Sequence, residues 1–203
     1  MDLGTLARDA LLVVVAYLVG GIPWGIIVTR LAGKPDPRTV GSGRTGGANV
    51  MRTAGIGWAA LSGILDVFKG VVVVLLARLA GGGTVLAVLA ALAAILGHSR
   101  SPFIGLKGGR GVSVALGSLL VIEPVVAVLA IPVYAVVLLV SHYSSLASLT
   151  ASTLAGAGLI VMVLAAQLPP AYIAFGVAGP ALIWLFHADN VQRLLQGQER
   201  KLY

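Results

Sequence analysis

Cysteine is absent from this sequence of 203 residues, and charged residues make up only 10% of it. The lack of cysteine excludes disulfide bonds, thiolate metal sites and thiol catalysis. So little charge is incompatible with an ordinary soluble domain of this length, which needs far more polar surface to cover its core. The three histidines and seven carboxylates are too scattered to form a metal-ligand pattern. These absences point to a membrane protein without a metal.

Apolar residues are abundant: they make up 58% of the chain, and the mean hydropathy is +1.00. A membrane span needs about 20 apolar residues, and the blocks are of helix length, without the alternation of a transmembrane barrel. The sequence therefore predicts an all-α, polytopic integral membrane protein that forms one domain over residues 1–203. The seven predicted transmembrane helices are 10–31, 56–80, 83–97, 112–122, 124–141, 146–166 and 171–187.

The connections between these segments alternate between short, nearly uncharged ones and long, basic ones. Eleven of the fourteen Lys and Arg residues lie on the long connections or at their helix ends. Because positive residues mark the cytoplasmic side, we expect the N-terminus outside and the C-terminus in the cytoplasm. Seven crossings fit this parity, which favours a break at Glu123-Pro124. The net charge of +7 is then explained by topology and anionic ligands, without nucleic acid.

The first polar motif, residues 41–52, reads GSGRTGGANVMR. It contains G-x-G-x-x-G, but no strand precedes it, so a dinucleotide fingerprint is excluded. Glycines let backbone N–H groups converge on an anion, and the start of a following helix adds a favourable dipole. Ser42 supplies a hydroxyl and Arg52 a planar group suited to phosphate. The alternative is a flexible loop whose arginines only signal topology.

The second motif runs from Gly97-His98 to Lys107-Gly108-Gly109-Arg110-Gly111, directly before an apolar segment. It lacks the spacing and the Lys-Ser/Thr ending of a Walker A loop. Three glycines interleaved with two cations again indicate an anion cradle at a helix N-terminus.

The third motif begins at His187 and Asn190, which a helix continuing through both would place on one face. A histidine at the membrane boundary is equally typical of a snorkelling interfacial residue. A hydroxyl cluster at 143–148 contains Ser145 and Ser148. Asp66 and Lys69 are spaced as an ion pair within an apolar segment, where pairing lowers the cost of both charges; we interpret that pair as structural.

Together these motifs resemble those of the bacterial acyl-phosphate:glycerol-3-phosphate acyltransferases, the PlsY family of small seven-helix membrane enzymes. The family's patterns resemble GSGNxGATNxxR, then GH followed by KGGKGV, then HxxNxxRLxxGxE. The third is met by His187, Asn190, Arg193, Leu194, Gly197 and Glu199. The chain departs from the family at Arg44, Ala48 and Arg110, where Asn, Thr and Lys are usual, and at 100–101. The resemblance extends in order over nearly the whole chain.

The resemblance implies transfer of an acyl chain from acyl phosphate to the 1-hydroxyl of glycerol-3-phosphate, giving lysophosphatidic acid and phosphate, the first step of phospholipid synthesis. It implies catalytic roles for Ser42, Arg52, Lys107, His187 and Asn190. Substrate binding falls to Gly43, Arg44, Gly46, Asn49, Gly108, Gly109, Arg110, Gly111, Ser145 and Ser148, and structural roles to Asp66, Lys69 and Glu199. The general base is either His187 or the phosphate of the acceptor.

An acyl phosphate is already activated, so neither a metal nor a cofactor is required; the enzyme must hold two anions close together. We expect a monomer in the bacterial inner membrane, with its site on the cytoplasmic side, its acyl chain among membrane lipid and an acyl-phosphate-forming enzyme nearby. Two alternatives are a small anion-binding transporter and a paralogue that has lost activity through the changes at Arg44 and Ala48.

Overall fold

The computed structural model describes residues 2–202, and every regular element in that range is helical. The α-helices are α1 (Leu3–Gly21), α2 (Trp24–Leu31), α3 (Gly47–Ala54), α4 (Ile56–Leu79), α5 (Gly83–Ser99), α6 (Val112–Ile122), α7 (Pro124–Ser141), α8 (Ser144–Leu164), α9 (Tyr172–Phe186) and α10 (Ala188–Leu195). Short 3₁₀ turns are η1 (Pro37–Thr39) and η2 (Pro102–Ile104). The all-α prediction is confirmed.

The predicted bounds agree with α4 to α9 within two residues, but the first segment is wrong. The helix begins at Leu3, because Asp2 caps it by accepting a hydrogen bond from the Thr5 N–H at 2.8 Å. It ends before Pro23, whose missing N–H interrupts the helical ladder. The predicted break at Glu123-Pro124 is confirmed: the Glu123 carboxylate accepts from the Val125 N–H at 3.1 Å, and α7 starts afresh.

A helix continuing through His187 and Asn190, which would place both on one face, is not formed. The chain bends by 66° between α9 and α10, and His187 occupies the junction. Both side chains are nevertheless buried and line the same pocket, His187 from the bend and Asn190 from the first turn of α10.

Within residues 2–202, five helical segments are long and apolar enough to cross a membrane, and six if the bent pair of α9 and α10 counts as one span. The five are Leu3–Leu31, α4, Gly83–Ile104 (α5 with η2), α7 and α8. Helix α6 has 11 residues, so its length of about 16 Å is well below the roughly 30 Å of the hydrocarbon core.

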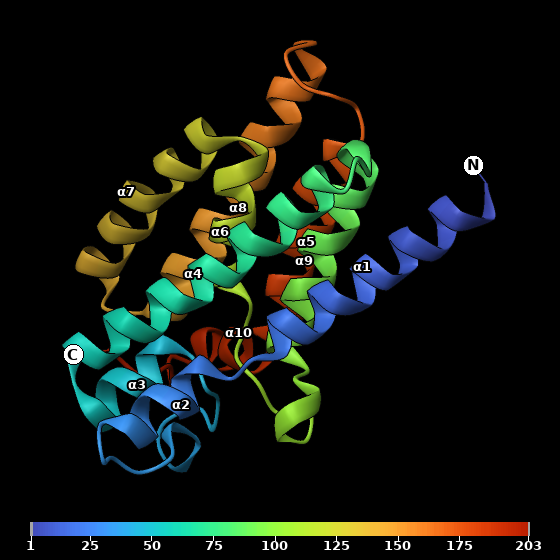
Figure 1. Cartoon of the computed structure of the whole chain (residues 1–203). Helices are drawn as coiled ribbons and strands as arrows, with labels where there is room; N and C mark the ends of the chain where they lie inside the picture. Colours follow the sequence, from blue (N-terminus) through green and yellow to red (C-terminus); the bar gives the residue numbers. More distant parts are fainter. Residues whose placement is uncertain (1, 203) are drawn as a thin grey trace.

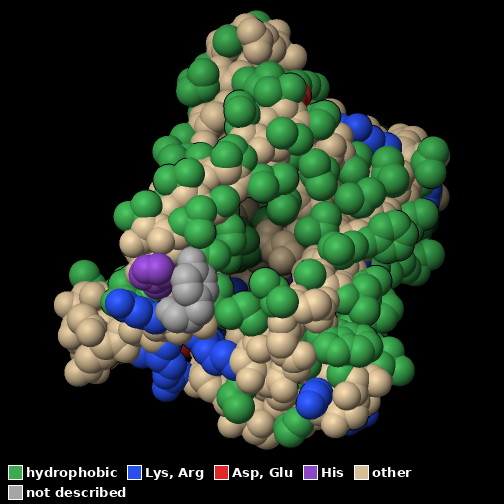
Figure 2. Space-filling view, turned by 90° about the vertical axis from the view of Figure 1, so that its left-hand side faces the viewer, with side chains coloured by type: hydrophobic (Ala, Val, Ile, Leu, Met, Phe, Trp, Pro, Cys, Tyr) green, Lys and Arg blue, Asp and Glu red, His purple; other side chains and the backbone are tan. Residues whose placement is uncertain are grey.

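The helices run between two ends of the molecule (Figure 1). One end holds the short connections after α4, α6 and α8, and the other holds α2, α3, α10 and the loops around them. A space-filling view shows apolar side chains over the helices, a hollow about midway along the bundle, and cations gathered below it toward the second end (Figure 2). The polar segments of the sequence are therefore gathered at one end of an apolar bundle.

Glycines let the helices approach closely. A Cβ at Gly97 of α5 would lie 2.0 Å from the Tyr17 carbonyl oxygen of α1, and one at Gly117 of α6 would lie 1.9 Å from the Val67 oxygen of α4. Such small residues are typical of helix contacts in membranes. The second contact fixes α6 against α4, and with it the start of α6 beside the polar loops.

Candidate active site

A cavity of about 560 Å³ lies among α4, α6, α7, α8 and α9 at the polar end of the bundle. Its polar mouth is lined by Ser42, Arg44, Asn49, Gly109, Arg110 and His187. Its deeper walls are apolar and include Leu116, Leu119, Leu159, Phe175 and Ile183. Figure 2 shows the hollow opening between apolar side chains, with cations below it. This cavity can take a ligand that is anionic at one end and apolar along its length.

A second, smaller pocket of about 50 Å³ adjoins the first. It is lined by Ser42, Ala48, Arg52, Arg110, Ser144, Ser145, His187, Asn190, Arg193, Glu199 and Arg200. Both linings include Ser42, Ala48, Arg110, Ser144 and His187. The two spaces therefore meet at these side chains, and a small polar ligand in one can reach a larger ligand in the other.

Asn49 organises the first motif. Its buried amide donates to Ser42 Oγ at 3.0 Å and to the Arg44 carbonyl at 2.9 Å, and its oxygen accepts from Arg52 Nη1 at 3.1 Å. Gly41 has φ +58°, and a Cβ there would lie 2.4 Å from the Asn49 oxygen, so glycine is required at this turn. The motif thereby presents the Ser42 hydroxyl and the Arg52 guanidinium to the smaller pocket.

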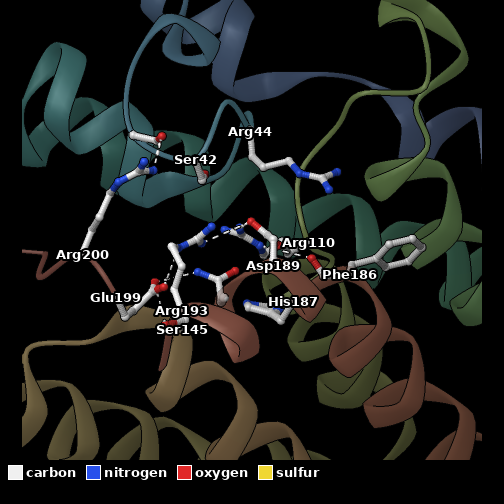
Figure 3. Close-up of polar contacts among 12 residues, drawn as sticks. Ser42, Arg44, Arg110, Ser145, Phe186, His187, Asp189, Arg193, Glu199 and Arg200 are labelled. Atoms are coloured by element: carbon white, nitrogen blue, oxygen red, sulfur yellow. Dashed lines mark hydrogen bonds and ion pairs between the residues drawn. The ribbon is translucent and has the colours of Figure 1, made fainter. Parts of the chain in front are cut away.

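Arg52 and Arg200 are two of the four arginines that line that pocket. Arg52 donates to the Lys201 carbonyl at 3.0 Å. Arg200 donates to the Gly41 carbonyl (Figure 3), so both side chains are held in place. Burial and the nearby charge of Arg200 lower the pKa of the Arg52 guanidinium, and Glu199 offsets only part of this. A dianionic phosphate between these two arginines would relieve their repulsion.

A second pair of cations faces the larger cavity. Arg110 forms an ion pair with Asp189 at 2.8 Å and donates to the Phe186 carbonyl at 3.2 Å. Burial lowers the pKa of the Arg110 guanidinium; Asp189 opposes the shift and Arg44 adds to it. Among residues 2–202 no carboxylate pairs with Arg44. Arg44 points toward the space beside Arg110 (Figure 3), which makes this a second place for an anion.

Carboxylates fix the rest of the pocket wall. Glu199 accepts from Asn190 Nδ2 at 2.6 Å, from Ser145 Oγ at 3.0 Å and from Arg193 Nε at 2.9 Å. The Asn190 oxygen is buried without a hydrogen-bond partner in the described structure. Because an unpaired buried acceptor is costly, it is available for a ligand hydroxyl. These contacts hold the Glu199 carboxylate between α8 and α10, and its structural role stays a prediction.

His187 lies where the two spaces meet, with 3% of its surface exposed. Its Nδ1 is 2.8 Å from the Ile183 carbonyl, which can only accept, so Nδ1 carries the proton. Burial and then the charge of Arg110 lower the pKa of His187 to about 4. At neutral pH the ring is therefore uncharged, and Nε2 presents a lone pair. Within the described residues no protein group hydrogen-bonds to that nitrogen.

Not every predicted residue lines these spaces. Lys107 and Gly43 are exposed and line neither the cavity nor the smaller pocket. Gly43 has a φ of +67°, which the turn requires. Gly108 is buried against the end of α5. Gly46, Gly109, Gly111 and Ser148 line the larger cavity, although the Ser148 hydroxyl donates to the Ser144 carbonyl at 2.8 Å. The predicted ion pair between Asp66 and Lys69 is present at 2.8 Å.

Arg200, Asp189 and Ser144 reach the site without having been predicted there, and His98 lines the larger cavity. No local pattern marks Arg200, because the tail returns to the first motif through tertiary contacts alone. Asp189 had a usable signal: it precedes Arg193 by four residues on a short helix, the spacing of an ion pair.

The fold and the site are those of a membrane-embedded enzyme that binds anionic substrates. Two spaces with cationic walls share a neutral histidine, and the larger one continues into an apolar cavity suited to an acyl chain. The chain belongs to the glycerol-3-phosphate acyltransferase family, whose model matches residues 10–197. It is an integral membrane protein of that enzyme family.

Individual relatives agree with this assignment. The chain is 40% identical to glycerol-3-phosphate acyltransferase 3 of Dehalococcoides mccartyi strain 195 over 97% of each chain. It is 41% identical to the enzyme of Thioalkalivibrio sulfidiphilus, covering 94% of this chain and 92% of the relative. The crystal structure of PlsY, an integral membrane glycerol-3-phosphate acyltransferase in its glycerol-3-phosphate form, superposes with a TM-score of 0.87 at 37% identity, over 96% and 95% of the two chains.

Proposed function

We propose that this enzyme transfers the acyl chain of an acyl phosphate to the 1-hydroxyl of glycerol-3-phosphate at the junction of the two pockets. The observation that carries the assignment is two pairs of cations beside His187: Arg52 with Arg200 in the smaller pocket, and Arg44 with Arg110 in the larger cavity. Two phosphates can then be bound at once. Structures of the relative PlsY in glycerol-3-phosphate and lysophosphatidic acid forms support the same substrate and product.

Glycerol-3-phosphate fits the smaller pocket. Arg52 and Arg200 hold its phosphate, and the Asn190 oxygen and the Ser42 hydroxyl orient its hydroxyls. The 1-hydroxyl then faces His187 Nε2. Binding both reactants in this geometry converts a bimolecular reaction into an effectively unimolecular one, which is where most of the acceleration arises.

The donor occupies the larger cavity, with its phosphate between Arg44, Arg110 and the backbone of Gly109 to Gly111. The 1-hydroxyl oxygen attacks the acyl carbonyl carbon and its proton passes to His187 Nε2. The new ester C–O bond forms as the bond from the carbonyl carbon to the phosphate oxygen breaks, and the electron pair leaves with inorganic phosphate. The cations stabilise the charge that develops there.

The apolar part of the cavity takes the acyl chain. Its lining follows one face of α8 from Ser144 to Leu159, a rise of about 22 Å for 15 residues. Half of the hydrocarbon core is about 15 Å thick. The cavity is therefore long enough for the acyl chains found in a membrane leaflet, and we assign long-chain acyl phosphates as donors.

Purified protein supplied with a long-chain acyl phosphate and labelled glycerol-3-phosphate tests the assignment directly. The expected products are labelled lysophosphatidic acid and an equal amount of phosphate. Phosphate release without labelled lipid would show hydrolysis alone. Uptake of glycerol-3-phosphate into sealed vesicles without either product would favour a transporter, and no product or uptake would indicate an inactive paralogue.

For topology, we assign the polar end to the cytoplasmic face of a bacterial inner membrane, with seven crossings, of which α6 is a short one. Contacts among the basic connections support this: Arg38 Nη1 donates to the Ile104 carbonyl at 3.5 Å, and the Leu202 N–H donates to the His142 carbonyl at 2.8 Å. The two ends of α6 lie toward opposite ends of the bundle (Figure 1).

Single cysteines at the exposed positions Thr39, Phe103 and Gln198 should resist an impermeant thiol reagent in intact cells and react after lysis. The parent chain has no cysteine, so labelling reports only the introduced site. A cysteine at the exposed Gln167, on the connection between α8 and α9, is the matched control and should react in intact cells. Labelling of any of the first three from outside would contradict the orientation.

Arg44 carries a separate prediction, because it replaces the family's usual asparagine. Arg44→Ala should raise KM for acyl phosphate about tenfold, the effect of losing a hydrogen bond to a charged group. KM for glycerol-3-phosphate should stay within about twofold. Adding Ala48→Thr, which restores a hydroxyl at the junction of the pockets, should recover part of the loss. Lys34→Ala, an exposed cation at the same end, is the control; equal effects of both variants would contradict the assignment.

A further inference from the structure

Three buried ionisable side chains lie within the bundle and have no part in the reaction as described above. Asp66 and Lys69 on α4 and His98 on α5 are 3%, 2% and 8% exposed. Asp66 and His98 also line the larger cavity, and neither lines the smaller pocket. Ionisable groups inside membrane helices are costly, so a cluster that faces a ligand cavity is a candidate for function.

The contacts of Lys69 define the protonation of His98. Lys69 Nζ is 2.8 Å from Asp66 Oδ1, donates to the Ile22 carbonyl at 3.0 Å and is 2.9 Å from His98 Nδ1. An ammonium group has three N–H donors and no acceptor. The ammonium therefore donates to the Ile22 carbonyl and to His98 Nδ1, which must present its lone pair, while its contact with Asp66 is an ion pair.

The opposite tautomer fits poorly. A proton on His98 Nδ1 would point at the Lys69 ammonium. Among the described residues its one carboxylate neighbour is Asp66, whose Oδ1 is 3.5 Å away, too far for a good hydrogen bond. A second positive charge on the ring would also lie beside Lys69 in a medium of low dielectric. His98 is therefore neutral with its proton on Nε2.

The glycine motif leaves this Nε2–H uncovered. The Gly109 N–H donates to the His98 carbonyl at 3.0 Å, and the Gly108 N–H donates to the Ser99 carbonyl at 3.2 Å. These two hydrogen bonds hold Gly108 and Gly109 against the end of α5, next to the imidazole of His98. A Cβ at Gly109 would lie 2.0 Å from His98 Nε2, so a side chain there would cover the nitrogen. In the described part of the chain, Nε2 has no hydrogen-bond partner.

We propose that His98 donates its Nε2–H to the phosphate of the acyl phosphate, and that Lys69 is the positioning residue that fixes this tautomer. The proposal rests on the proposed function, because it names a further contact to that donor. His98 lines the donor cavity together with Gly109 and Arg44. A preorganised donor at the leaving phosphate stabilises the charge that develops as the carbonyl–oxygen bond breaks.

The two cavity histidines then have complementary roles set by their second partners. The Ile183 carbonyl takes the Nδ1 proton of His187 and leaves Nε2 as an acceptor. The Lys69 ammonium occupies the Nδ1 lone pair of His98 and leaves Nε2 as a donor. One neutral imidazole receives the proton of the attacking hydroxyl, and the other supports the leaving group.

A pair of amide substitutions separates this role from a structural one. Glutamine reaches the position of Nε2 and supplies an N–H there, whereas asparagine reaches only that of Nδ1 and can accept from Lys69. We expect His98→Gln to keep kcat/KM for acyl phosphate within about threefold of the parent enzyme. His98→Asn should lower it about tenfold, with KM for glycerol-3-phosphate unchanged in both. Ser99→Ala, which removes a neighbouring buried hydroxyl without a partner, is the control.

The reverse order, with asparagine active and glutamine inactive, would show that His98 only partners Lys69 and would overturn the proposal, as would normal kinetics in both. If both variants unfold in detergent, Gly109→Ala gives an independent test by covering Nε2. It should also lower kcat/KM for acyl phosphate about tenfold, whereas an unchanged value would overturn the proposal. Failure of the proposed function is distinct, because the parent enzyme itself would then make no lysophosphatidic acid.

Discussion

Replacing His187 with glutamine should lower kcat by about 100- to 10,000-fold, the range that a positioned general base contributes. Glutamine can still accept a hydrogen bond from the 1-hydroxyl, but its amide cannot take up a proton at neutral pH. We assign His187 as the base because its ring is neutral and lies between the two pockets. Its Nδ1 proton is held by the Ile183 carbonyl, which leaves Nε2 free to accept. Steady-state kinetics with saturating donor and acceptor measure the effect.

The same variant tests the competing assignment of the base. If the phosphate of glycerol-3-phosphate removes the proton, His187 only orients the hydroxyl, and glutamine should retain kcat within about tenfold. His142→Gln is the matched control, since His142 lines neither pocket. Thermal unfolding in detergent must show the same midpoint for the parent and both variants, because the bend between α9 and α10 is built on His187.

The long apolar helices could be predicted because their signal is local. Long apolar runs predict α4 to α9 within two residues, and Glu123-Pro124 marks a true break, since a carboxylate followed by proline starts a helix. The start of α1 was missed because Asp2, Arg8 and Asp9 make its first turns polar. Helices α3 and α10 have eight residues each, too few for a clear periodic pattern.

Which polar residues meet is decided by tertiary contacts that no local pattern contains. Ser42, Arg52, His187 and Asn190 were predicted together and do share one pocket. Lys107 has the same charge and a glycine-rich setting, yet its side chain is exposed and lines neither space. The resemblance therefore identifies the motif, while the path of the backbone decides which cation of the motif faces the cavity.

The C-terminal tail also has a role that local sequence patterns do not reveal. In the sequence, Gly197 and Glu199 of this tail belong to the third motif, and its cations are explained by topology. In the structure Lys201 accepts from Arg52 through its carbonyl, and Glu199 joins Ser145, Asn190 and Arg193. The smaller pocket thus draws on segments about 150 residues apart, and its walls exist only after the helices have packed.

Arg52→Ala should raise KM for glycerol-3-phosphate by about 10- to 100-fold, because the lost contact is charge-assisted and lies in a shielded pocket. KM for acyl phosphate should change by less than about threefold, since Arg52 lines only the smaller pocket. Arg52→Lys keeps the charge but not the planar group that reaches both Asn49 and the phosphate, and should recover only part of the affinity. Arg38→Ala removes an arginine of the same connection that already pairs with Asp36 at 2.8 Å, and should leave both constants unchanged. If Arg52→Ala raised KM for acyl phosphate more than KM for glycerol-3-phosphate, the two substrates would have to be assigned to the opposite pockets. Normal values of both constants would show that Arg52 does not bind substrate.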